Sequence, residues 1–125
     1  MDFNLTKEQR DIKKAARAFA EGEFPDLAKE SDREEKTDRG LMNKACDLGF
    51  VGVFIDEEYG GAGYGYLESA LVIEEFWSVD PGLGSQIASV CFGSENQKRK
   101  YLHSFKERTQ CFELVREAIY GKALV

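Results

Sequence analysis

The stretch FVGVFIDEEYGGAGYGYLESALVIEEFW, residues 50–77, decides the fold of this chain. It begins with a short apolar run at 50–55, and a segment with helical spacing of its apolar residues closes it at 66–77. Between them lies a turn whose four glycines allow backbone angles that a Cβ would forbid: Gly60, Gly61, Gly63 and Gly65. The stretch therefore predicts a buried extended connector, a tight reversal and a helix.

Composition and charge restrict the class of protein. The chain has 125 residues, of which 42% are hydrophobic and 32% charged, and its formal net charge is −6. That negative surplus disfavours binding to the phosphates of nucleic acids. The amino end has neither a basic leader nor an apolar signal segment, and no apolar run reaches the roughly 20 residues that cross a membrane. We therefore expect one soluble, cytoplasmic domain without nucleic-acid or membrane partners.

Helical periodicity also dominates on the amino-terminal side of this stretch. Thr6 and Gln9 have the spacing of a capping box, which predicts the start of a first helix. Gly22 and Pro25 are expected to end or bend that helix. The polar segment 26–36 is expected to form a short exposed helix and a loop.

A second helix and several carboxy-terminal helices are predicted in the same way. Asp38 is expected to cap a helix that holds Leu41, Met42, Ala45 and Leu48 and stops at Gly49. Further helices are expected at 83–92, after a capping box at 94–97, and at 109–120. The whole pattern predicts an all-α fold, an orthogonal or bundle-like array of about five to six helices.

No catalytic or metal site is complete within the sequence. Glu74 and Glu75 are neighbours on a helix and point about 100° apart, so we expect surface charges or salt-bridge partners there. The glycine spacing fits neither a dinucleotide fingerprint nor a P-loop, which favours a structural turn over a nucleotide-binding loop. His103, the only histidine, lacks a nearby nucleophile motif. Three cysteines without regular spacing indicate no zinc site and no disulfide framework: Cys46, Cys91 and Cys111.

Several motifs occur in the order found in one enzyme family. LTKEQR lies at 5–10, and SDRE at 31–34 stands where that family has WDRE. EEYGGAG, LVIEE and VDP follow between residues 57 and 81, and FGSENQKRKYL at 92–102 is close to FGTEEQKxxYL. Over residues 3–105 the chain thus resembles the N-terminal helical domain of the acyl-CoA dehydrogenases.

The resemblance implies an activity for a complete member of that family. Such enzymes use FAD to desaturate acyl-CoA thioesters at the α,β position in fatty acid metabolism, with a glutamate as the base. The flavin-binding segment and that glutamate belong to later domains, which this sequence does not match. The resemblance implies a domain at 1–105 and a helical tail without family match at 106–125. No catalytic or cofactor-binding residue and no bound FAD are expected in this chain alone.

The resemblance also implies where an acyl chain would lie. The helix after the Asp80-Pro81-Gly82 step is shorter than in the family by roughly two helical turns. By register, Gly84, Ser85, Ala88 and Ser89 would face the acyl tail, where small side chains leave room. Ordinary packing of small residues between helices explains the same pattern.

Three functional alternatives remain open from the sequence. The first is the N-terminal domain of an acyl-CoA dehydrogenase that is inactive as this chain alone. The second is a non-enzymatic helical interaction module that exposes apolar surface or self-associates. The third is one part of a split enzyme whose other domains are supplied in trans.

Overall fold

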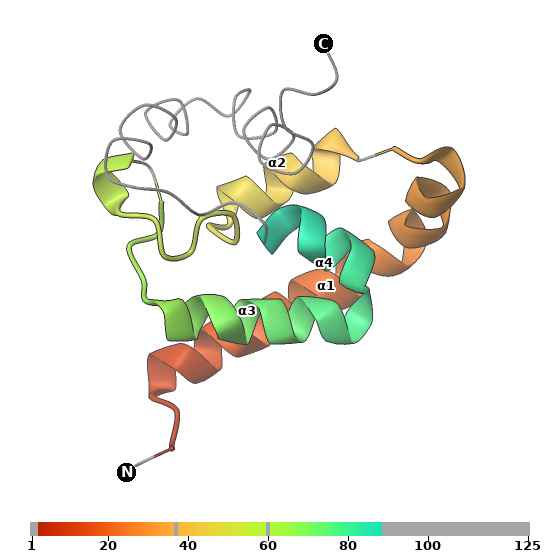
Figure 1. The fold of residues 1–125 in the computed structure, drawn as a ribbon. Coiled ribbons are helices and arrows are strands. Elements are labelled where there is room, and N and C mark those ends of the chain that lie inside the picture. Colours follow the sequence, from red (N-terminus) through yellow and green to blue (C-terminus); the bar gives the residue numbers. More distant parts are fainter. Residues whose placement is uncertain (1–2, 37, 60, 89–125) are drawn as a thin grey trace.

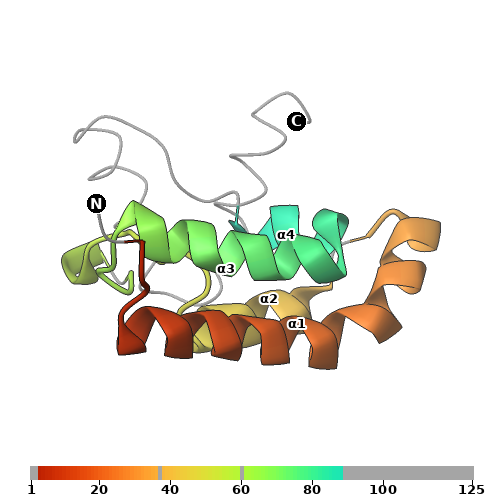
Figure 2. The ribbon, with the colours of Figure 1, turned by 90° about the horizontal axis from the view of Figure 1, so that it is seen from below.

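The computed structural model describes residues 3–36, 38–59 and 61–88. These residues form four α-helices and a short 3-10 helix, and they contain no strand, as the all-α prediction requires (Figure 1). The elements are α1 (Lys7–Glu34), α2 (Arg39–Asp47), η1 (Glu57–Tyr59), α3 (Tyr66–Val79) and α4 (Pro81–Ala88). Figure 2 shows two layers, with α1 and α2 in one and α3 and α4 in the other.

The first helix begins where the sequence predicts but continues further. The Thr6 hydroxyl accepts from the Gln9 amide at 3.1 Å, and the Gln9 side chain accepts from the Thr6 amide at 2.9 Å. Of the two alternatives for Gly22 and Pro25, an end of the helix is wrong, because Pro25 lies inside α1 and the segment expected to form a separate short helix continues α1 to Glu34. Phe24, beside it, is fully buried, so packing offsets the backbone hydrogen bond that the proline removes. The ribbon of α1 bends in its second half (Figure 2).

The second helix has the predicted start and an earlier end. The Asp38 carboxylate accepts from the Leu41 amide at 2.6 Å and so caps α2. Leu41, Met42 and Ala45 are buried, as expected for its apolar face. Leu48 instead follows the helix as its C-cap and is 61% exposed, so it does not belong to the core.

The connector at 50–55 is buried, although it is not extended. Val51, Val53 and Ile55 are all buried, which confirms their predicted role. The chain passes through consecutive turns here, and Gly52 has a positive φ of 73°. These turns fold three apolar side chains into a short length of backbone without a strand partner.

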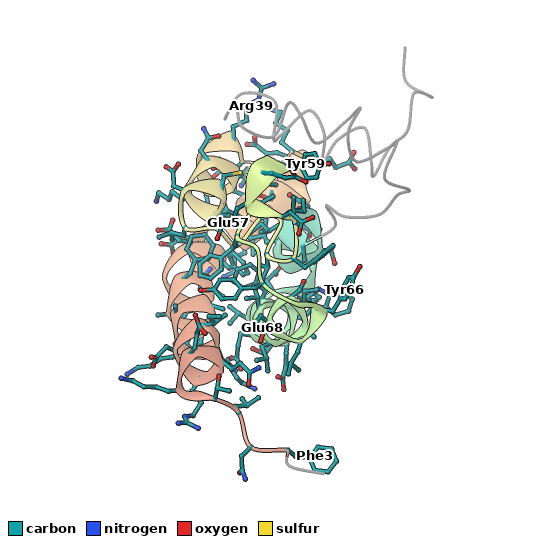
Figure 3. The ribbon with its side chains drawn as sticks, turned by 90° about the vertical axis from the view of Figure 1, so that its left-hand side faces the viewer. Phe3, Arg39, Glu57, Tyr59, Tyr66 and Glu68 are labelled. Atoms are coloured by element: carbon teal, nitrogen blue, oxygen red, sulfur yellow. The ribbon has the colours of Figure 1, made fainter. Side chains whose placement is uncertain are left out.

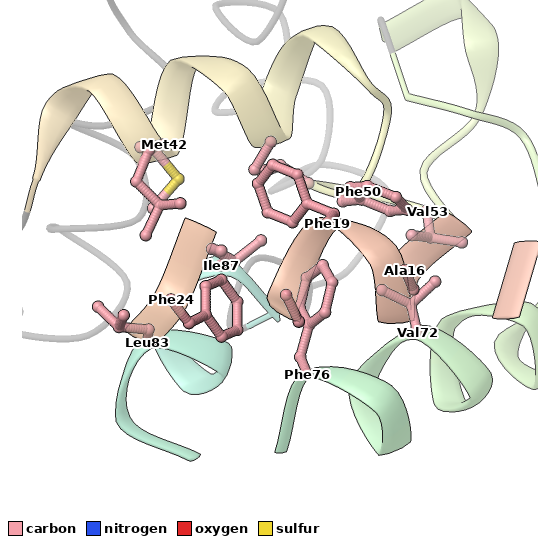
Figure 4. Close-up of a cluster of buried hydrophobic side chains, with 14 of the residues drawn as sticks. Ala16, Phe19, Phe24, Met42, Phe50, Val53, Val72, Phe76, Leu83 and Ile87 are labelled. Atoms are coloured by element: carbon pink, nitrogen blue, oxygen red, sulfur yellow. The ribbon is translucent and has the colours of Figure 1, made fainter. Parts of the chain in front are cut away.

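Four phenylalanine rings form the centre of the core (Figure 4). Phe76 of α3 is fully buried, and its ring centroid lies 5.7 Å from Phe19, 5.4 Å from Phe24 and 5.3 Å from Phe50. Phe19 and Phe24 belong to α1, and Phe50 belongs to the connector. The rings therefore fix α3 against α1 and against the connector at one point.

The last two described helices agree with the sequence within a few residues. α3 ends at Val79, two residues beyond the helical segment expected at 66–77, and Asp80 caps α4 by accepting from the Leu83 amide at 2.8 Å. Pro81 occupies the first turn of α4, where a missing amide and a fixed φ are tolerated. The predicted elements at 94–105 and 109–120, together with Ser89, Cys91, His103 and Cys111, lie outside the described residues.

Candidate functional site

The glycine loop, residues 56–65, is held by backbone hydrogen bonds within the loop and to the connector at 50–55. The amides of Gly61, Ala62 and Gly63 donate to the carbonyls of Asp56, Gly52 and Ile55 at 3.2, 3.3 and 2.8 Å. A phosphate-binding loop directs such amides toward its ligand. Because these donors are engaged within the chain, the described part of the loop does not fit a flavin pyrophosphate. It is a structural turn, as the glycine spacing predicted.

A carboxylate joins the start of α3 to the start of α1. One oxygen of Glu68 accepts from the Gln9 side-chain amide at 2.8 Å, and the other accepts from the Gly65 amide at 3.0 Å. Figure 3 shows Glu68 between the two helices. The hydrogen bond from Gln9, followed by backbone hydrogen bonds, lowers the pKa of Glu68 below its ordinary value of 4.5.

This lowered pKa predicts a stability change at acid pH. The ionised Glu68 stabilises the fold fully above pH 4.5, and its contribution is lost as pH falls through the lower folded-state pKa. The unfolding free energy of Glu68→Gln should therefore fall below that of the parent at neutral pH, and the gap should narrow on acidification. Urea titrations of both proteins at several pH values measure this difference in unfolding free energy. A difference that does not depend on pH would contradict the lowered pKa of Glu68.

Glu75 is a buried carboxylate held by two cations of α1. It is 4% exposed, one of its oxygens lies 3.2 Å from the Lys13 ammonium, and the other contacts the Arg17 guanidinium. The Lys13 ammonium also lies 2.7 Å from the carboxylate of Glu74, which is exposed. Hydrogen bonds to Glu74 and then Glu75 raise the pKa of Lys13. These contacts confirm the salt-bridge interpretation of the acidic pair.

The inward reach of Lys13 and Arg17 was missed in the sequence analysis. As lysine and arginine, both would ordinarily be placed on the solvent face of the first helix, so the sequence alone gives them no inward role. Their spacing of four residues nevertheless places them together, beside buried Ala16 and Ala20. The signal that could have revealed this contact is Glu75, an acidic residue at a position of the next long helix where helical spacing predicts burial.

Removing the charge of Glu75 should destabilise the fold more than removing the charge of Glu74. Glu75→Gln should lower the unfolding free energy by about 1–3 kcal/mol, because two cations lose a buried partner while keeping partial access to water. Glu74→Gln is the matched control, and a change of at most about 1 kcal/mol is expected for its exposed pair. Chemical denaturation followed by circular dichroism measures both. Equal losses in the two variants would show that burial of Glu75 is unimportant.

The residues expected to border an acyl tail lie in different surroundings. Gly84 is buried against α3, and a Cβ there would come within 3.0 Å of the Trp77 ring and 3.1 Å of the Phe76 Cβ. This close approach supports the packing explanation for Gly84. Ser85 and Ala88 are half-buried, and the Ser85 hydroxyl donates to the Pro81 carbonyl at 2.7 Å.

A separate cavity lies between the end of α1 and the start of α4. Its volume is about 580 Å³, and its lining includes Asp32, Glu35, Asp80 and Gln86. Within the part of the chain that the structure describes, the side-chain oxygen of Gln86 is buried and has no hydrogen-bond partner. Neither Gly84, Ser85 nor Ala88 lines this cavity. This cavity is therefore not the space that the predicted acyl-facing residues would border.

The outer face of α3 is unusually apolar. Tyr66 is 71% exposed, and Leu67 and Trp77 are each 53% exposed. Tyr66 points away from α1 (Figure 3), and its ring contacts that of Phe54 in a tilted arrangement, with ring centroids 4.9 Å apart. The opposite face of α3 carries Phe76 in the core. Apolar residues on both faces indicate that this helix is suited to contacts beyond the described fold.

Other kinds of site find no support in the described residues. No group of three or more histidine, cysteine or acidic side chains there is arranged to hold a metal ion. Cys46 is half-buried and is the only cysteine among residues 3–36, 38–59 and 61–88. Among the described helices, none combines the length and apolar character needed to span a membrane.

Known proteins resemble the chain over most of its length. The family model for the acyl-CoA dehydrogenase N-terminal domain matches residues 6–107. The short-chain-specific acyl-CoA dehydrogenase of Clostridium acetobutylicum is 37% identical over 111 residues, which cover 82% of this chain and 29% of that protein.

Solved structures resemble the chain as well. A chain from work on the electron transferring flavoprotein of Acidaminococcus fermentans has a TM-score of 0.71 and 41% identity, covering 87% of this chain and 31% of its own. Butyryl-CoA dehydrogenase from Megasphaera elsdenii has a TM-score of 0.64 and 28% identity, covering 97% of this chain and 31% of its own. The chain thus spans less than a third of the length of these proteins.

Proposed function

Because the chain belongs to the acyl-CoA dehydrogenase family as an N-terminal domain, we propose that it forms one wall of an acyl-CoA site. The complete enzyme would desaturate an acyl-CoA thioester at the α,β position with FAD as the electron acceptor. The observation that carries this proposal is the family match across residues 6–107. The chain's own contribution is to hold and shape the site, and the reactive groups are supplied by other parts of the enzyme.

The contacts around α3 are consistent with a domain that holds and shapes the site. The rings about Phe76 and the ion pairs of Glu75 fix α3 on α1 at two neighbouring positions. Gly84 then brings α4 close against α3. We propose that Ser85 and Ala88, which are half-buried, face the acyl tail, and Ser89 with them by register. Gly84 would set the distance between the helices and so the depth of the wall.

The same proposal divides the chain into two parts. Residues 1–105 would form the family domain, and residues 106–125 would form an additional tail. The family match ends at residue 107, which supports this boundary. The remaining enzyme would meet the domain either within a longer chain or as a partner in trans, and the apolar outer face of α3 favours such a contact.

A chimera tests the proposal directly. Residues 6–107 would replace the matching segment of the Clostridium acetobutylicum relative, which supplies the remaining domains. We expect a flavin-containing protein that oxidises butyryl-CoA with an artificial electron acceptor. In the same chimera, Ala88→Leu should reduce kcat/KM for octanoyl-CoA at least about tenfold more than for butyryl-CoA, because added volume shortens the space for the tail.

The outcomes of this test separate the two parts of the proposal. An active chimera in which Ala88→Leu affects both substrates equally would remove Ala88 from the acyl wall and leave the family role intact. A folded, flavin-loaded chimera that binds no acyl-CoA would contradict the family role itself. The parent relative, carried through the same purification, controls for loss of flavin during preparation.

A further inference from the structure

We draw no further inference here: the strongest candidate, the exposed apolar face of α3 that carries Tyr66, Leu67 and Trp77, supports no proposal because nothing in the structure shows what covers it.

Discussion

Replacing Phe76 by alanine is expected to lower the free energy of unfolding by about 3–5 kcal/mol, the largest effect of any single substitution considered. Phe76 is completely buried, and its ring centroid lies within 5.7 Å of the centroids of three other phenylalanine rings. Truncation removes apolar burial and leaves a void where α1, α3 and the connector meet. Domains of this size have a total stability of only about 5–15 kcal/mol.

The measurement is equilibrium unfolding in urea, followed by far-ultraviolet circular dichroism. Leu67→Ala is the matched control, because Leu67 lies on the same helix but is 53% exposed. That control should change stability by no more than about 1 kcal/mol. If Phe76→Ala and Leu67→Ala unfold at the same urea concentration, the aromatic cluster is not the centre of the core.

Gly61→Ala is expected to destabilise the fold by about 3 kcal/mol, through crowding and not through backbone angles. A Cβ on Gly61 would lie 2.1 Å from the Ile55 carbonyl oxygen and 2.4 Å from the Ile55 Cβ. The obstructing atoms include backbone, so a side-chain rotation cannot relieve the contact. The glycine loop would have to open and break hydrogen bonds such as the one from the Gly63 amide to the Ile55 carbonyl.

A second glycine supplies the control with the opposite sign. Gly22 lies within α1, and a Cβ there would meet nothing within 4 Å. Gly22→Ala should therefore stabilise the protein by about 0.5–1 kcal/mol through helix propensity. Thermal unfolding of the two variants should shift in opposite directions. A shift of Gly61→Ala upward would contradict the close backbone approach in the loop.

Helix starts were predictable because their signals are local. Thr6 and Asp38 each satisfy an amide three residues away, and that spacing is visible in the sequence. The end of α1 was not predictable in this way. A proline at position 25 ordinarily ends a helix, but α1 continues past it, and the neighbouring Phe24 is buried against Phe76, which is distant in the sequence.

In the candidate site, too, features set by neighbouring residues were predictable from the sequence, whereas contacts between helices were not. The acidic pair could be identified as salt-bridge partners, but its cations lie on another helix, and their contact depends on how α1 and α3 pack. The small residues of α4 allowed two explanations from the sequence. Only the closeness of Trp77 and Phe76 to Gly84 favours the packing explanation for that residue. Ser85 and Ala88 stay proposals, because their role depends on a ligand.

Whether this chain is one wall of a flavin-dependent acyl-CoA site is tested by the visible flavin absorbance of the chimera when butyryl-CoA is added without oxygen, beside the same measurement on this chain alone. We expect that the chimera binds flavin and that butyryl-CoA bleaches it, whereas this chain alone holds no stoichiometric flavin. Stoichiometric flavin with turnover in this chain alone would contradict the claim, as would a flavin-loaded chimera that butyryl-CoA fails to bleach.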